Sequence, residues 1–112
     1  MNEISWSKKE KGIARHIFKR AYERECIELI NKVKDLAGMI ETPEDMWELH
    51  DFLSEKRKET DGKYDYRFSV MIFVLGRLLS EGWITFDDFE GLTNDKIEKI
   101  KEFAKLLNNS KS

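Results

Sequence analysis

The sequence has few of the residues that cross-link or interrupt a fold. It contains one cysteine, Cys26, one proline, Pro43, and six glycines among 112 residues. A single cysteine excludes an intrachain disulfide and a metal cluster built on cysteines, and the apolar helical pattern around Cys26 is typical of a buried structural thiol. Because proline and glycine are scarce, most of the chain is free to form long helices.

Long apolar runs and an excess of one charge are also missing. No run approaches the roughly 20 apolar residues of a membrane span, and the first residues lack the apolar core of a secretion signal. Twenty basic against 22 acidic residues give a net charge of −2, so no overall field attracts nucleic acid. The basic residues near the start are Lys8, Lys9, Lys11, Arg15, Lys19 and Arg20. On a helix, such a cluster is more often a solvated face. We therefore expect a cytoplasmic protein with no membrane span and no nucleic-acid partner.

Side chains for catalysis or metal binding are equally scarce. The two histidines, His16 and His50, are not spaced with glutamates as in a known metal-ligand set. His50 and Asp51 are adjacent, so on a helix their side chains would point about 100° apart, which is poor geometry for a catalytic dyad. Glycine-rich phosphate loops and nucleophile-elbow motifs are absent from the sequence. We expect no catalytic residue, no metal and no cofactor.

The sequence does contain a series of helical patterns, and the first is long. Ser7 with Glu10 forms a capping-box pattern, and apolar residues then recur at three- and four-residue steps as far as Ile40. A helix of about 30 residues would be roughly 45 Å long, whereas a compact domain of this size has a radius of gyration of roughly 13 Å. Either this helix bends within a monomeric bundle, or a second copy of the chain covers it. The lack of a breaker favours the homodimer. Its candidate apolar seam consists of Leu29, Ile30 and Val33.

The second helical pattern carries two stripes. Thr42 is placed to cap this helix, and Pro43 suits its first position. The core stripe consists of Met46, Leu49, Phe52 and Leu53. The neighbouring stripe consists of Trp47, His50, Asp51, Ser54 and Arg57. Tryptophan and arginine are over-represented among residues that carry binding energy, so this polar and aromatic stripe is a candidate surface for protein recognition. The alternative is that Trp47 and His50 pack against the first helix.

The remaining patterns predict a helical head. Residues 59–62 predict a turn, with Gly62 in a left-handed conformation. Residues 63–81 then read as a largely apolar helix that ends at Gly82, with Trp83 folding back onto it. Thr85 is placed to cap a short helix through Phe89, and Thr93 a final helix.

We therefore predict an all-α fold with a long N-terminal helix and a compact helical head, assembled as an elongated homodimer. Residues 1–112 would form a single domain. Residues 7–60 would be the dimerisation arm, residues 61–107 the head, and residues 108–112 a frayed tail.

Three stretches resemble the fluorescence recovery protein family of cyanobacteria. They read W-x-L-H-D-F-L-S-x-K-R from Trp47, D-G-K-Y-D-x-R-x-S-V-x-I-F-V from Asp61, and L-L-x-E-G from Leu78. The resemblance implies an all-helical homodimer without catalytic chemistry. Such proteins bind the photoactivated orange carotenoid protein, mainly through its C-terminal domain. They speed its return to the resting orange form, which ends photoprotective quenching of the antenna at the thylakoid.

The resemblance also implies roles for residues at matching positions. His50 and Asp51 would lie near the dimer seam, with Ile30 at an apolar position within it. The partner-binding residues would be Trp47, His50, Asp51 and Arg57 on the arm, with Phe73 and Lys99 on the head. Two alternatives are another partner with a related nuclear-transport-factor-like domain and a generic helical scaffold dimer.

Overall fold

The computed structural model describes residues 4–110 of the chain. Within that range there are four α-helices, two short 3-10 helices and no strand. The elements are α1 (Lys8–Gly38), α2 (Pro43–Lys63), η1 (Phe68–Val70), α3 (Met71–Ser80), η2 (Phe86–Phe89) and α4 (Asn94–Ser110). The predicted all-α fold with a long N-terminal helix and a helical head is confirmed.

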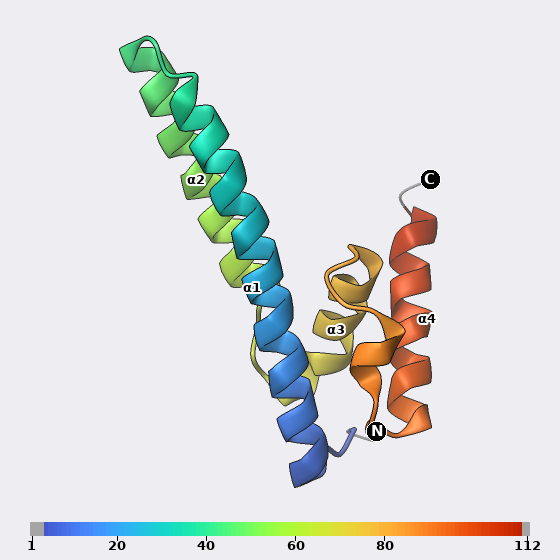
Figure 1. The fold of residues 1–112 in the computed structure, drawn as a ribbon. Coiled ribbons are helices and arrows are strands. Elements are labelled where there is room, and N and C mark those ends of the chain that lie inside the picture. Colours follow the sequence, from blue (N-terminus) through green and yellow to red (C-terminus); the bar gives the residue numbers. More distant parts are fainter. Residues whose placement is uncertain (1–3, 111–112) are drawn as a thin grey trace.

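Helices α1 and α2 form an antiparallel two-helix arm that projects well beyond the head (Figure 1). A capping box starts α1, because the amide of Glu10 donates to Oγ of Ser7 at 3.1 Å and the Ser7 amide donates to the Glu10 carboxylate at 3.2 Å. A second capping box, between Thr42 and Asp45, starts α2. The radius of gyration is 16.9 Å, compared with roughly 13 Å for a compact domain of this size. The described chain is therefore elongated.

The head consists of α3, α4, both 3-10 helices and the first half of α1, which closes its apolar core (Figure 1). The fully buried side chains of that core are Ala14, Ile17, Ala21, Met71, Leu75, Leu78, Ile84, Phe89 and Ile100. Helices α3 and α4 approach closely at Gly76, where an added Cβ would lie 2.8 Å from Cδ2 of Phe103. One continuous helix thus supplies both the head core and the arm.

The prediction for residues 59–81 is wrong in two respects. Helix α2 continues through Gly62 to Lys63, and the Tyr64 amide still donates to the Thr60 carbonyl at 2.9 Å. Gly62 therefore does not adopt the predicted left-handed conformation. Residues 64–67 are not helical, so the single helix expected over residues 63–81 is reduced to η1 and α3. The physical reason is that Lys63 is held by carboxylates from α1 and from the end of α3.

The end of α3 follows the prediction. Gly82 has a φ of 85°, and the Trp83 amide donates to the Leu78 carbonyl at 3.0 Å, which is a Schellman ending. Thr85 and Asp88 form a capping box on η2. Helix α4 runs through Ser110, so Asn108–Ser110 are helical rather than frayed. The rest of the predicted tail, residues 111–112, lies outside the described residues.

In residues 4–110 no helix is both long and apolar enough to cross a membrane. The same residues hold no group of three or more histidine, cysteine or acidic side chains placed to bind a metal ion. Cys26 carries a free thiol and is half-buried on α1 rather than fully buried as predicted.

Candidate recognition surfaces

The arm leaves much of its apolar surface uncovered within one chain. Beyond Ala21, no described residue of α1 is buried, and Lys63 is the only buried residue of α2. Of the predicted seam, Ile30 is 52% exposed, while Leu29 and Val33 are half-buried. The exposed apolar side chains of the arm are Ile27, Ile30, Met39, Met46, Trp47 and Leu53. Exposed apolar side chains concentrated in one part of a protein are candidates for contacts with another protein.

The polar and aromatic stripe of α2 faces solvent along the arm. Trp47 is 59% exposed, so within the chain it does not pack into the interface with α1. Its indole meets the His50 ring edge to face, with the ring centroids 6.0 Å apart. Nδ1 of His50 lies 3.3 Å from Oδ1 of Asp51, so the two side chains lean together instead of pointing apart as predicted. Both side chains are largely exposed.

Arg57 lies on the same helix, two turns nearer the head. Its Nε donates to Oδ2 of Asp61 at 3.1 Å, and its side chain is 81% exposed. Asp61 lines a hollow between α1 and α2 together with Tyr22. A hydrogen bond with Cys26 raises the pKa of Tyr22, and the charge of Asp61 adds to that effect. Because Asp61 engages only Nε, the outer edge of the Arg57 guanidinium remains suited to a bidentate contact with a carboxylate.

The head carries a second surface, an open groove of about 1000 Å³ that Phe73 and Lys99 both line. Phe73 is 53% exposed and packs edge to face on Phe103, with the ring centroids 5.0 Å apart. Lys99 reaches the groove from α4 and donates to Asp95 at 3.1 Å. The apolar residues that complete the groove are Ile4, Trp6, Phe68, Ile72 and Leu106. The fold thus brings together Phe73 and Lys99, the two head residues to which the family resemblance gives a role in partner binding.

The sequence patterns did not reveal the rest of this groove. Trp6 precedes the first helix, and Phe68 lies in a 3-10 turn, so neither belongs to a periodic stripe. Leu106 could have been noticed, because it is apolar yet falls outside the stripe that buries Ile100 and Ala104 on α4. The arm stripe and the head groove remain separate surfaces in one chain.

Together these features define an elongated all-helical protein whose main surface elements are an uncovered apolar arm and an apolar groove on the head. Features of this type are typical of proteins that act by binding other proteins.

Comparison with known proteins assigns a family. The sequence model of the family described as photoprotection regulator fluorescence recovery protein matches residues 6–104. The fluorescence recovery protein of Synechocystis sp. is 46% identical over 104 residues, which cover 93% of this chain and 95% of that protein. The chain therefore belongs to the fluorescence recovery protein family of photoprotection regulators.

Solved structures of this family have the same fold. The Fremyella diplosiphon fluorescence recovery protein is similar with a TM-score of 0.85 and 48% identity, over 90% of this chain and 99% of that one. The protein from Synechocystis sp. PCC 6803 is similar with a TM-score of 0.86 and 46% identity, again over 90% and 99% of the two chains.

Proposed function

We propose that this protein is a homodimer that binds the photoactivated form of an orange carotenoid protein, through that partner's C-terminal domain. It accelerates the partner's return to the resting form and so ends photoprotective quenching. In this proposal the protein uses no catalytic residue, metal or cofactor, and it acts in the cytoplasm beside the thylakoid-bound antenna. Membership of the photoprotection regulator family supports the proposal.

The observation that carries the dimer is the uncovered apolar surface of the arm. A second arm laid against Leu29, Ile30 and Val33 would remove these side chains from water, which stabilises by about 25 cal/mol for each Å² of apolar area buried. His50 and Asp51 lie on the exposed surface of the other arm helix and would border this seam. In a two-fold dimer each of these residues would contribute twice.

The charges of the arm favour an antiparallel dimer. Residues 41–55, at the tip of the arm, contain six acidic residues and no lysine or arginine. Residues 8–20, at its base, contain six basic residues and a single acid, Glu10, which is buried against Lys96. An antiparallel pairing brings each acidic tip toward the basic base of the other arm, whereas a parallel pairing sets like charges side by side.

The partner would contact Trp47, His50, Asp51 and Arg57 on the arm, and Phe73 and Lys99 on the head. A regulator that accelerates a conformational change without chemistry must bind the compact transition state more tightly than the open form. Two separate surfaces suit this task, because a protein that holds both domains of an opened partner raises their effective concentration.

The experiment that tests this function mixes the purified protein with photoactivated orange carotenoid protein and follows the return of the orange spectrum in the dark. We expect a faster return that grows with protein concentration, and a complex in size-exclusion chromatography. If neither acceleration nor a complex is observed, the proposed partner is wrong. The protein would then act on another partner with a nuclear-transport-factor-like domain, or serve as a helical scaffold.

A further inference from the structure

The junction between arm and head is held by a buried lysine. Lys63 is the last residue of α2, only 8% of its surface is exposed, and it is the one buried side chain of that helix. Its ammonium donates to Glu25 on α1 at 2.6 Å and to Glu81 at the end of α3 at 2.7 Å. Three consecutive α-helices therefore meet at a single charged group.

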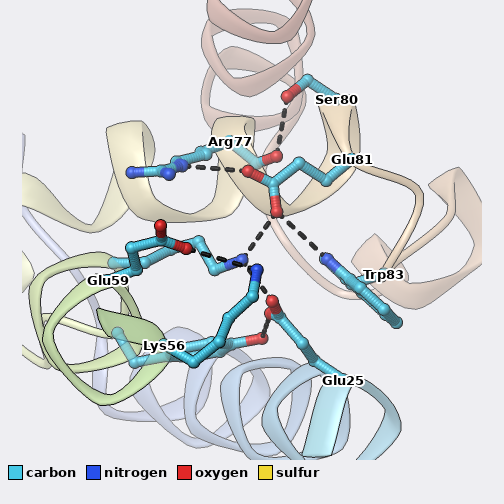
Figure 2. Close-up of polar contacts among 9 residues, drawn as sticks. Glu25, Lys56, Glu59, Arg77, Ser80, Glu81 and Trp83 are labelled. Carbon is cyan, nitrogen blue, oxygen red and sulfur yellow. Dashed lines mark hydrogen bonds and ion pairs between the residues drawn. The ribbon is translucent and has the colours of Figure 1, made fainter. Parts of the chain in front are cut away.

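The carboxylates around Lys63 are themselves fully engaged. Figure 2 shows the Glu81 carboxylate between the Arg77 guanidinium and the Trp83 indole, which donate to it at 3.0 Å and 3.1 Å. The second oxygen of Glu25 accepts from the Tyr64 hydroxyl at 2.7 Å. Burial raises the pKa of Glu81, but the hydrogen bonds from Lys63 and Arg77 outweigh it and hold that pKa below its usual value. Hydrogen bonds to each group of such a cluster offset the cost of removing its charges from water.

Apolar packing at the end of α2 comes from its C-cap residue Tyr64, whose ring meets Phe18 and Tyr22 of α1 edge to face, with centroids 5.4 Å and 5.1 Å apart. Lys63 is the contact that also reaches α3. All other residues of α2 are exposed or half-buried, and the four residues after Lys63 have no helical structure. The head is attached to α1 by Ile17 and Ala21, and Lys63 links the end of α2 to both α1 and the end of α3. Lys63 also lines a hollow of about 590 Å³ between arm and head, and Phe73 forms part of the same wall.

We propose that Lys63 is a positioning residue for partner recognition. It fixes the end of α2 against α1 and α3, and so sets the spacing between Trp47 and Arg57 on the arm and Phe73 and Lys99 on the head. This inference rests on the proposed function, since it assigns a purpose to a fixed spacing of two surfaces. A partner that binds both surfaces at once gains from a preformed spacing, because no ordering of the head is then required on binding.

The test measures the spacing and the function separately. Spin labels at Glu48→Cys on the arm and Glu98→Cys on the head, in a Cys26→Ser background, report the distance within one protomer when labelled chains are diluted with unlabelled ones. With Lys63→Met we expect a broadened distance distribution, unchanged dimer mass and at least tenfold weaker acceleration of partner recovery. Lys63→Arg, which keeps the charge, should restore part of both signals.

A matched control is Lys56→Met. Lys56 is two turns earlier on α2 and pairs at 3.3 Å with Glu59 of the same helix, so its loss should leave both the distances and the recovery rate as in the wild type. A narrow, wild-type distance distribution for Lys63→Met would overturn the inference, whatever the recovery assay gives.

If Lys63→Met loses helicity, the same two measurements are made on Glu81→Gln, because this variant weakens the junction without leaving the lysine unpaired. If the wild type itself fails to accelerate recovery, the proposed function is wrong, while the distance measurement still decides the role of Lys63.

Discussion

At the scale of single residues, two buried lysines tie the head to α1. Lys96 donates to Glu10 at 3.0 Å, the Thr93 amide donates to the other oxygen of that carboxylate at 3.1 Å, and Lys63 makes the corresponding bridge through Glu25. Burying a charge is costly unless hydrogen bonds compensate it, so each bridge is stable only when both partners are in place. These bridges flank Ala14, Ile17 and Ala21 on α1 and so fix the register of the head on the long helix.

The Glu10 bridge predicts how stability depends on pH. Burial raises the pKa of Glu10, but hydrogen bonds from Lys96, Thr93 and Ser7 outweigh it and lower that pKa from 4.5 to about 2. Since the pKa is lower in the folded state, the stabilisation is fully present above pH 4.5 and is lost as the pH falls toward 2. We expect Glu10→Gln to cost roughly 3 kcal/mol at pH 7 and almost nothing at pH 2.

Denaturant unfolding of the two proteins across this pH range provides the measurement. Glu98→Gln is the control, because Glu98 makes only an exposed contact with Lys101 at 3.9 Å and should cost less than about 0.5 kcal/mol. A cost of Glu10→Gln that stays constant from pH 7 to pH 2 would contradict the assigned role of the carboxylate.

The exposure of Arg57 predicts a separation of binding from assembly. We expect Arg57→Glu to weaken complex formation with photoactivated orange carotenoid protein at least tenfold, because the guanidinium would be replaced by a charge that repels a carboxylate. Lys58→Glu, the neighbouring residue on α2, makes the same charge change and should have a much smaller effect. Affinity is read by titration and assembly by light scattering. Recovery kinetics like those of the wild type would remove Arg57 from the partner surface.

At the scale of helices, the sequence predicted the capped helix starts better than the end of α2, the start of α3 or the tertiary contacts. The capping residues Ser7, Thr42 and Thr85 act within three residues of sequence, so local pattern sufficed. Gly62 looked like a turn residue, but Lys63 is drawn into α2 by carboxylates 38 and 18 residues away. The groove residues Trp6 and Phe68 share no local pattern, and they meet only because the segment before α1 folds onto η1, which brings their ring centroids to 5.4 Å. The roles of the six partner-binding residues stay predictions.

Because α3 and α4 approach closely at Gly76, we expect the stability of the fold to be sensitive to a side chain at this position. An added Cβ there would meet the Phe103 side chain at 2.8 Å and the Ile100 carbonyl oxygen at 3.2 Å. The side chain can shift, but the backbone oxygen belongs to a packed helix, so we expect Gly76→Ala to destabilise by about 1–3 kcal/mol. Gly12→Ala is the matched control, since nothing lies within 4 Å of its Cβ, and it should stabilise α1 by roughly 0.5–1 kcal/mol. Thermal unfolding of both variants distinguishes the two effects, and equal melting temperatures would show that the helices are not closely packed at this point.

At the scale of the whole molecule, the arm is a surface that one chain cannot cover. The long helix has its buried residues only in its first half, whereas Ile27 and Ile30, farther along α1, and Met39, just after its end, are exposed. The length of the first helix alone predicted this uncovered surface. A helix of about 30 residues is longer than the width of a compact head formed by the rest of the chain. The pattern could not predict which apolar positions would be covered by α2 and which left open, since that depends on how the two helices are rotated against each other.

The proposed dimer seam predicts the result of a single charge placed within it. We expect Ile30→Glu to yield monomers of 13.3 kDa with helicity largely retained, because a buried glutamate would face its own copy or apolar side chains across the two-fold axis. Asn31→Glu adds the same charge about 100° around the helix and should leave a dimer of twice that mass. Light scattering at micromolar concentration makes the comparison, and an Ile30→Glu protein with the wild-type mass would place the seam elsewhere.

The unbroken course of α1 from head core to arm tip makes this helix a molecular ruler. No loop separates the two regions, so in an assembly of two arms the distance between the heads is set by the number of residues in the helices. Each residue added to the arm lengthens it by about 1.5 Å and rotates the remainder of the helix by about 100°. Only insertions or deletions that change the arm by close to two full helical turns, or a multiple of that, would therefore keep the heads facing the same way. The length of the arm would thus determine whether a partner can contact both heads at once, independently of which side chains it touches.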